Sequence, residues 1–114
     1  MANARFSILT GTLLWVVCAI APAHATVDVE AAKALAKAND CLKCHAADKD
    51  KRGPSMGKIA AKYKGVPDAR AKAVEHMTTG PLVKLSDGSE INHKIVDSKD
   101  VNGLANIADW FLSH

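Results

Sequence analysis

Two cysteines and a histidine stand close together at residues 41–45, in the order Cys-Leu-Lys-Cys-His. The spacing Cys-x-x-Cys-His is typical of covalent attachment of a c-type haem. Two thiols on one turn can form thioether bonds to the two vinyl groups of a haem. The histidine that follows, His45, is then held under the iron as its proximal ligand. The pattern therefore predicts one covalently bound haem c on Cys41 and Cys44.

Other uses of two nearby cysteines fit this chain less well. A structural zinc ion needs about four protein ligands, and Cys18 is the only further cysteine. A thioredoxin-like redox pair requires strands around it, whereas the flanking residues have helical character. A disulfide between Cys41 and Cys44 is the remaining alternative.

The first 25 residues are typical of a secretory signal peptide. Arg5 is followed by an apolar run from residue 6 to residue 22, and then by Ala23-His24-Ala25. A small-x-small tripeptide of this kind marks a cleavage site. An uncleaved membrane anchor is the alternative, because the run is nearly long enough to span a bilayer. We expect cleavage before Thr26, a mature domain over residues 26–114 and a periplasmic location, with no stable membrane insertion afterwards.

Length and charge limit the possible functions of the mature chain. Removing residues 1–25 from the 114-residue chain leaves 89 residues, with 14 basic and 12 acidic side chains once Arg5 is gone. Such a balance, with no arginine cluster or row of aromatic residues, does not indicate nucleic-acid binding. A domain this short has a marginal core. We therefore expect the haem itself to supply part of that core.

The mature chain is predicted to be all-α, with four or so helices in one domain. Residues 29–39 are rich in strong helix formers and follow Asp28, a suitable N-cap. Shorter helices are expected over residues 56–64, capped by Ser55, and over residues 68–79. A long loop over residues 80–97 then precedes a final helix capped by Ser98. The apolar stripe of that last helix consists of Val101, Leu104, Ile107, Ala108, Phe111 and Leu112.

Residues 29–113 resemble a short bacterial class I cytochrome c. The resemblance depends on an N-terminal helix before Cys41–His45, on Gly53-Pro54-Ser55, on the segment 59–65 and on the last helix around Trp110. It implies that the first and last helices cross and that the haem lies in a crevice. It also implies that the Pro54 carbonyl accepts a hydrogen bond from the second ring nitrogen of His45, which would fix the orientation and basicity of the ring.

The chain departs from this family on the distal side of the haem. The family usually places a methionine there, in a Pro-Met-Pro loop before the last helix. Counting back from Trp110, that position falls at residues 92–94, where His93 is the only strong iron ligand. Imidazole binds iron well, so we predict His93 as the distal ligand.

Other candidates for the distal position remain. Met77 is the main alternative, although it lies in a predicted helix 32 residues after His45 and is suited to filling core space. His76 precedes it and would point differently. Met56 follows the Gly-Pro-Ser segment too closely to reach the other haem face, and His114 is at the chain end. A vacant distal site is also possible.

Basic side chains gather in the segment expected to flank the haem edge. They are Lys43, Lys49, Lys51, Arg52, Lys58, Lys62 and Lys64. One interpretation is a docking surface for an acidic redox partner, since opposite charges steer encounter. The other is an ordinary solvated surface, because Asp48 and Asp50 are interleaved. The sequence does not decide between them.

Together these features predict a soluble, monomeric, periplasmic one-electron carrier with a single c-type haem and bis-histidine ligation. We expect no enzyme activity, because no acid–base pair is set aside for catalysis and six ligands leave no position for a substrate. Two alternatives remain. One is a ligand-binding or sensor haem protein with a labile distal site, and the other is the electron-accepting subunit of a periplasmic oxidoreductase.

Overall fold

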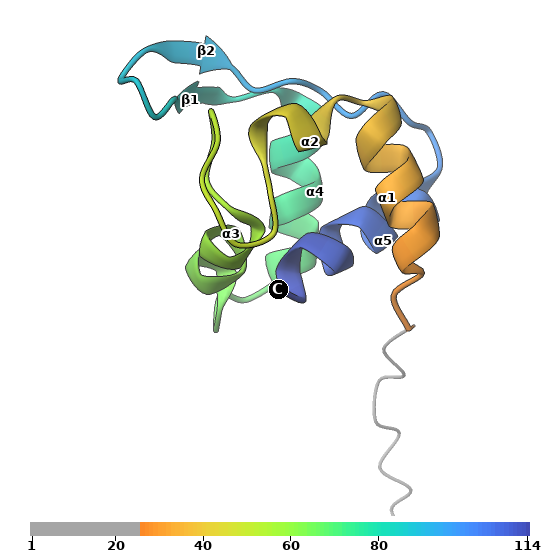
Figure 1. Cartoon of the computed structure of the whole chain (residues 1–114). Coiled ribbons are helices and arrows are strands. Elements are labelled where there is room, and N and C mark those ends of the chain that lie inside the picture. The colour runs from red at the N-terminus through yellow and green to blue at the C-terminus, as the bar shows by residue number, and fades with distance from the viewer. Residues whose placement is uncertain (1–25) are drawn as a thin grey trace, which may run out of the picture.

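The computed structural model describes residues 26–114, so the predicted signal peptide over residues 1–25 lies outside the described part of the chain. The described residues form five helices and one small hairpin (Figure 1). No helix among them is both long enough and apolar enough to cross a membrane. The predicted all-α class is confirmed, although the chain includes two short strands.

The first helix, α1 (Val29–Ala38), begins as the sequence predicts. The Asp28 side chain caps it by accepting a hydrogen bond from the backbone N–H of Ala31 at 3.0 Å. Ala32 and Ala36, one turn apart on the same face, are completely buried. Small side chains at both positions allow another helix to approach closely.

The helix that packs on this face is the last one, α5 (Val101–Leu112). Its Ile107, Trp110 and Phe111 form one core cluster with the two alanines of α1. Asn106 adds a reciprocal pair of hydrogen bonds, because its side chain accepts from the Asp28 N–H and donates to the Asp28 carbonyl, both at 2.8 Å. The expected packing of the terminal helices is therefore present (Figure 1).

The prediction that Ser98 caps the last helix is wrong. Asp100 is the N-cap, and its carboxylate accepts from the N–H of Asn102 at 3.0 Å. Ser98 lies two residues earlier and its hydroxyl accepts from the N–H of Asp100 at 3.1 Å. Both side chains are good cap formers, but the extended backbone at Asp100 delays the start of the helix until Val101.

Two further helices complete the wall around the core. Helix α3 (Met56–Tyr63) is capped by Ser55 as predicted, with the N–H of Lys58 at 3.2 Å from the hydroxyl. Helix α4 (Ala69–Thr79) follows a left-handed residue, Asp68, whose side chain makes no cap hydrogen bond. Both helices pack against α5.

The segment predicted as a long loop contains an antiparallel hairpin of β1 (Leu82–Lys84) and β2 (Glu90–Asn92). In Figure 1 the hairpin extends to one side of the helices. Its side chains are mostly exposed, so the sequence shows no alternation of buried and exposed residues. The hairpin instead depends on its turn, where Gly88 has a φ of +86° and the Asp87 carboxylate accepts from the N–H of Ser89 at 2.9 Å.

Candidate haem site

The attachment motif forms a single helical turn, α2 (Cys41–Cys44), immediately after α1. Residues three apart on such a turn lie on the same side of it, which places both thiols toward one side. Both cysteines are free and half-buried. Burial raises the pKa of the Cys41 thiol, so this group behaves as a protected thiol rather than as a reactive thiolate.

His45 follows the turn and is nearly fully buried. Its ring Nδ1 lies 2.6 Å from the carbonyl oxygen of Pro54, which is the contact that the family resemblance implies. The ring of Phe111 meets it edge-on, with centroids 5.7 Å apart. Because Nδ1 is held by the carbonyl, Nε2 is the nitrogen left to bind a metal.

The chain makes room for this ring at Gly53. A Cβ atom there would come 2.9 Å from Cε1 of His45, a distance that side-chain contacts do not allow. The N–H of Gly53 also donates to the carbonyl of Cys44 at 3.0 Å. The sequence predicts only that Gly53 interrupts the helical structure. The structure gives it a second role, because the absence of a side chain at residue 53 leaves space for the His45 ring.

Asp50 stabilises the same loop and was not singled out from the sequence. Its carboxylate accepts from the N–H of Ser55 at 2.9 Å and pairs with Lys58. The hydrogen bond from Lys58, followed by that from Ser55, holds the pKa of this carboxyl below its usual value. Asp50 thereby ties the loop after His45 to the start of α3. An aspartate five residues before a helix cap gives no recognisable sequence signal for this role.

His93 lies directly after β2, and the structure brings its ring close to that of His45. The two ring centroids are 6.1 Å apart and the ring planes differ by 30°. The backbone N–H of His93 donates to the carbonyl of Pro81 at 2.8 Å. This hydrogen bond fixes the start of the distal segment, residues 93–97, against the hairpin. The ring is half-buried. Two residues that are 48 positions apart in the chain therefore bring their imidazole rings close together.

The ring of His76, on α4, contacts His93 edge to face with centroids 4.7 Å apart. Burial is the main cause that lowers the pKa of both His76 and His93. A lowered pKa favours the neutral form of an imidazole, which has a nitrogen lone pair available for a metal.

The residues present fit a haem iron between the two histidines. If both rings directed a nitrogen at one iron with bonds of roughly 2 Å, their centroids would lie about 6 Å apart, and the observed separation is 6.1 Å. The Nδ1 atom of His93 is buried without a hydrogen-bond partner among the described residues. A buried polar atom of this kind is rare and calls for a partner. No three His, Cys, Asp or Glu side chains within residues 26–114 converge in a way that could hold a metal ion without a cofactor.

Among the alternative distal candidates, His76 contacts the His93 ring, and the other three lie as follows. Met56 is 2% exposed within the core cluster, as predicted. Met77 packs partly buried against the same cluster, and its carbonyl accepts from the N–H of Val96 at 2.8 Å. His114 is exposed, with Nδ1 2.9 Å from the carbonyl of Trp110.

The basic cluster is partly neutralised. Lys43 pairs with Asp40 at 3.0 Å, and Lys58 pairs with Asp50. Lys51 donates to the carbonyl of Leu42 at 2.6 Å. Within residues 26–114, the members of the cluster that make neither an ion pair nor such a hydrogen bond are Lys49, Arg52, Lys62 and Lys64. Any docking by charge therefore depends mainly on these four.

Comparison with known proteins identifies the family. The cytochrome c family model matches residues 29–110. The chain is similar to class 1 cytochrome MtoD from Sideroxydans lithotrophicus ES-1, with 48% sequence identity and a TM-score of 0.73 over 77% of this chain and 97% of that structure. It is also similar to cytochrome c552 from Nitrosomonas europaea, with 27% identity and a TM-score of 0.56 over 71% and 96% of the two chains. None of the curated proteins compared matches the sequence.

The family match spans the attachment turn and most of both terminal helices. The chain therefore belongs to the cytochrome c family of electron carriers and binds one covalently attached haem c.

Proposed function

We propose that the mature chain, residues 26–114, is a monomeric periplasmic one-electron carrier whose haem iron is bound by His45 and His93. The observation that supports this most directly is the 6.1 Å distance between the ring centroids of His45 and His93. When bound, the haem supplies a one-electron couple between ferric and ferrous iron. Cys41 and Cys44 would hold it through thioether bonds in both oxidation states.

The protein residues contribute by keeping the site rigid and closed. The Pro54 carbonyl and the Phe111 ring fix the orientation of His45, and the backbone hydrogen bond to Pro81 fixes the start of the distal segment. Ligands that are held in the same positions in both oxidation states cost little reorganisation when an electron moves. If His45 and His93 both hold the iron, no position on it would be open to a substrate. This arrangement supports electron transfer rather than catalysis.

The periplasmic location is supported by the signal-like segment over residues 1–25. The redox partner is proposed to present acidic side chains to the four members of the basic cluster that make no ion pair within residues 26–114, which are Lys49, Arg52, Lys62 and Lys64. Such a surface raises the encounter rate rather than the lifetime of the complex.

The test is spectroscopy of the intact holoprotein in both oxidation states, with His93→Ala as the variant. The parent should give the low-spin signature of two imidazole ligands and should lack the near-infrared sulfur-to-iron band that marks methionine ligation in this family. His93→Ala should become high-spin and bind carbon monoxide rapidly in the ferrous state. His114→Ala is the matched control, because it removes an exposed histidine at the C-terminal end of the chain, 21 residues after His93. A His93→Ala protein that stays six-coordinate and low-spin would show that the assignment is wrong.

A further inference from the structure

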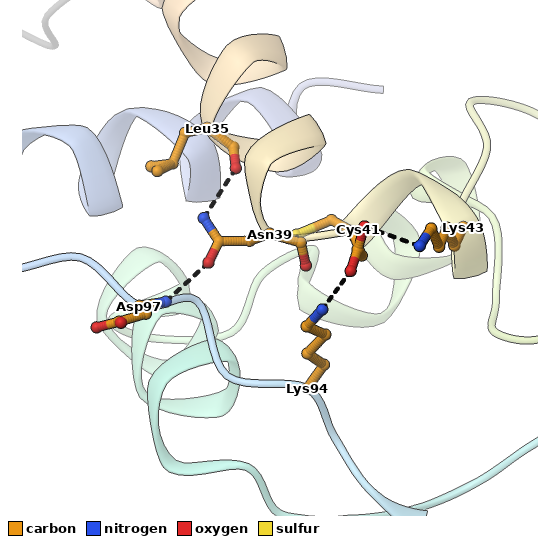
Figure 2. A network of polar contacts seen from close by, with 7 residues as sticks. Leu35, Asn39, Cys41, Lys43, Lys94 and Asp97 are labelled. Atoms are coloured by element: carbon orange, nitrogen blue, oxygen red, sulfur yellow. Dashed lines mark hydrogen bonds and ion pairs between the residues drawn. The ribbon is translucent and has the colours of Figure 1, made fainter.

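Two residues between α1 and the attachment turn, Asn39 and Asp40, contact the segment that carries His93, through Asp97 and Lys94 respectively. Figure 2 shows Asn39, Lys94 and Asp97 in this region. The Asn39 side chain donates to the carbonyl of Leu35 at 3.0 Å and accepts from the N–H of Asp97 at 2.9 Å. It therefore connects the last turn of α1 to the far end of the distal segment. Asp40 forms an ion pair with Lys94, the residue next to His93.

Asp40 is held in an unusual conformation. Its φ is +58°, in the left-handed region that costs a side chain energy and that glycine adopts freely. Aspartate in such a position is explained when its side chain has a use. Here the carboxylate lies between two ammonium groups, that of Lys43 at 3.0 Å and that of Lys94. The hydrogen bond from Lys94 is also the main cause that lowers the pKa of the Asp40 carboxyl.

The distal segment over residues 93–97 has few other fixed points. Its two further backbone contacts are the N–H of His93 with the Pro81 carbonyl and the N–H of Val96 with the Met77 carbonyl, both at 2.8 Å. These hold the segment to the hairpin and to α4. Of the hydrogen bonds and ion pairs within residues 26–114, those of Asn39 and Asp40 connect it to the side of the molecule that holds the attachment turn.

We propose that Asp40, with Asn39, is a positioning residue for the distal ligand, and that its ion pair with Lys94 sets how often His93 leaves the iron. The proposal depends on the proposed ligation by His93. Lys94 follows His93 directly, so a shift of Lys94 toward solvent shifts the ligand as well. The Asp40–Lys94 pair is largely exposed, with 37% and 62% of the two side chains accessible. Salt should therefore weaken it.

The experiment measures two quantities in the intact holoprotein: the rate at which the ferrous form takes up carbon monoxide, and hydrogen exchange of the Val96 and Asp97 amides. Asp40→Gly keeps the left-handed backbone at no steric cost and removes the carboxylate. We expect both rates to rise roughly two- to five-fold, the range that loss of an exposed ion pair supports. Asp68→Gly is the matched control, because Asp68 has a φ of +56° and makes no cap hydrogen bond with its side chain.

Substitutions at Lys94 separate positioning from general stability. Lys94→Arg keeps the ion pair and should match the parent, whereas Lys94→Gln should match Asp40→Gly. Raising the salt concentration should speed carbon monoxide uptake in the parent and should change it little in Asp40→Gly. Asp40→Asn, which also tolerates the left-handed conformation, provides the same test if the glycine variant folds poorly.

The possible results are distinct. If Asp40→Gly and Lys94→Gln take up carbon monoxide at the parental rate while His93→Ala is fast, the positioning role is wrong and the ligation stands. If Asp68→Gly accelerates uptake as much as Asp40→Gly, the effect is one of backbone flexibility and the proposal is overturned. If His93→Ala remains six-coordinate, the proposed ligation itself is wrong.

Discussion

Gly53 lies directly against the ring of His45, so that a Cβ atom at residue 53 would come 2.9 Å from Cε1 of the histidine and 3.4 Å from the carbonyl oxygen of Cys44. The same loop supplies the Pro54 carbonyl that holds Nδ1 of the ring. One dipeptide thus provides both the space for the proximal ring and its hydrogen-bond acceptor.

The first prediction follows from this contact. Gly53→Ala should displace the His45 ring or the loop and cost about 1–3 kcal/mol of unfolding free energy, as overpacking does. The holoprotein should also show a changed low-spin spectrum, because the ring turns relative to the haem. Denaturant unfolding and paramagnetic resonance measure the two effects.

Gly57→Ala is the control for this substitution. A Cβ atom at residue 57 would meet its nearest neighbour at 3.7 Å, an ordinary contact, and the residue lies inside α3. Alanine there should leave the spectrum unchanged and favour the helix by roughly 0.5–1 kcal/mol. Equal effects of the two substitutions would contradict the role given to Gly53.

A second prediction concerns the packing of the terminal helices, which holds the attachment turn in place. Ala36 is completely buried against α5, whereas Ala34 is exposed on the same helix. Ala36→Leu should lower the free energy of unfolding by about 1–3 kcal/mol because the buried site has no room for it. Ala34→Leu should change it by less than about 0.5 kcal/mol. Thermal unfolding of the two variants at matched haem content distinguishes them.

The sequence was most informative where the chemistry is local. The motif at residues 41–45 and the caps Asp28 and Ser55 depend on neighbours in the chain, and each was predicted correctly. The hairpin was missed because its mostly exposed strands have no apolar alternation. The contacts of Gly53 and Phe111 with His45, and of Asp40 with Lys94, join residues that only the folded chain brings together. Choosing His93 over Met77 required the family alignment, and the structure adds the facing geometry of the two rings as support.

The third prediction concerns acid. The pKa of Asp50 is lowered in the folded protein by the hydrogen bonds from Lys58 and Ser55. A carboxyl with a lowered folded-state pKa stabilises the fold above its unfolded value of 3.8, and this contribution is lost as the pH falls below that value. The unfolding free energy of the parent should therefore fall more steeply below about pH 4 than that of Asp50→Asn. Parallel pH profiles for the two proteins would show that the carboxylate does not contribute.

The fourth prediction concerns docking. If an acidic partner approaches Lys49, Arg52, Lys62 and Lys64, the rate of electron transfer to that partner should fall as the salt concentration rises. The reason is that exposed charges are screened beyond about 8 Å at physiological ionic strength. Lys49→Glu and Lys62→Glu should slow the reaction at low salt. Lys99→Glu makes the same change of charge in the segment that leads into α5, on the other side of the molecule from α3 (Figure 1). It should have little effect, and rates that respond equally to all three changes would indicate an effect of net charge alone.

The last prediction tests His93 against Met77. Methionine ligation raises the reduction potential of a haem relative to histidine ligation, so His93→Met should raise the potential and introduce the near-infrared sulfur-to-iron band if the loop permits binding. Met77→Leu should leave the spectrum unchanged and cost less than about 1.5 kcal/mol, because a side chain of similar volume still packs against the core cluster. Redox titration followed by optical spectroscopy measures both. Because the Met77 carbonyl holds Val96 and is retained in leucine, the substitution tests only the sulfur atom. A loss of low-spin character in Met77→Leu, together with its retention in His93→Ala, would exchange the two assignments, and the methionine of α4 would then be the distal ligand.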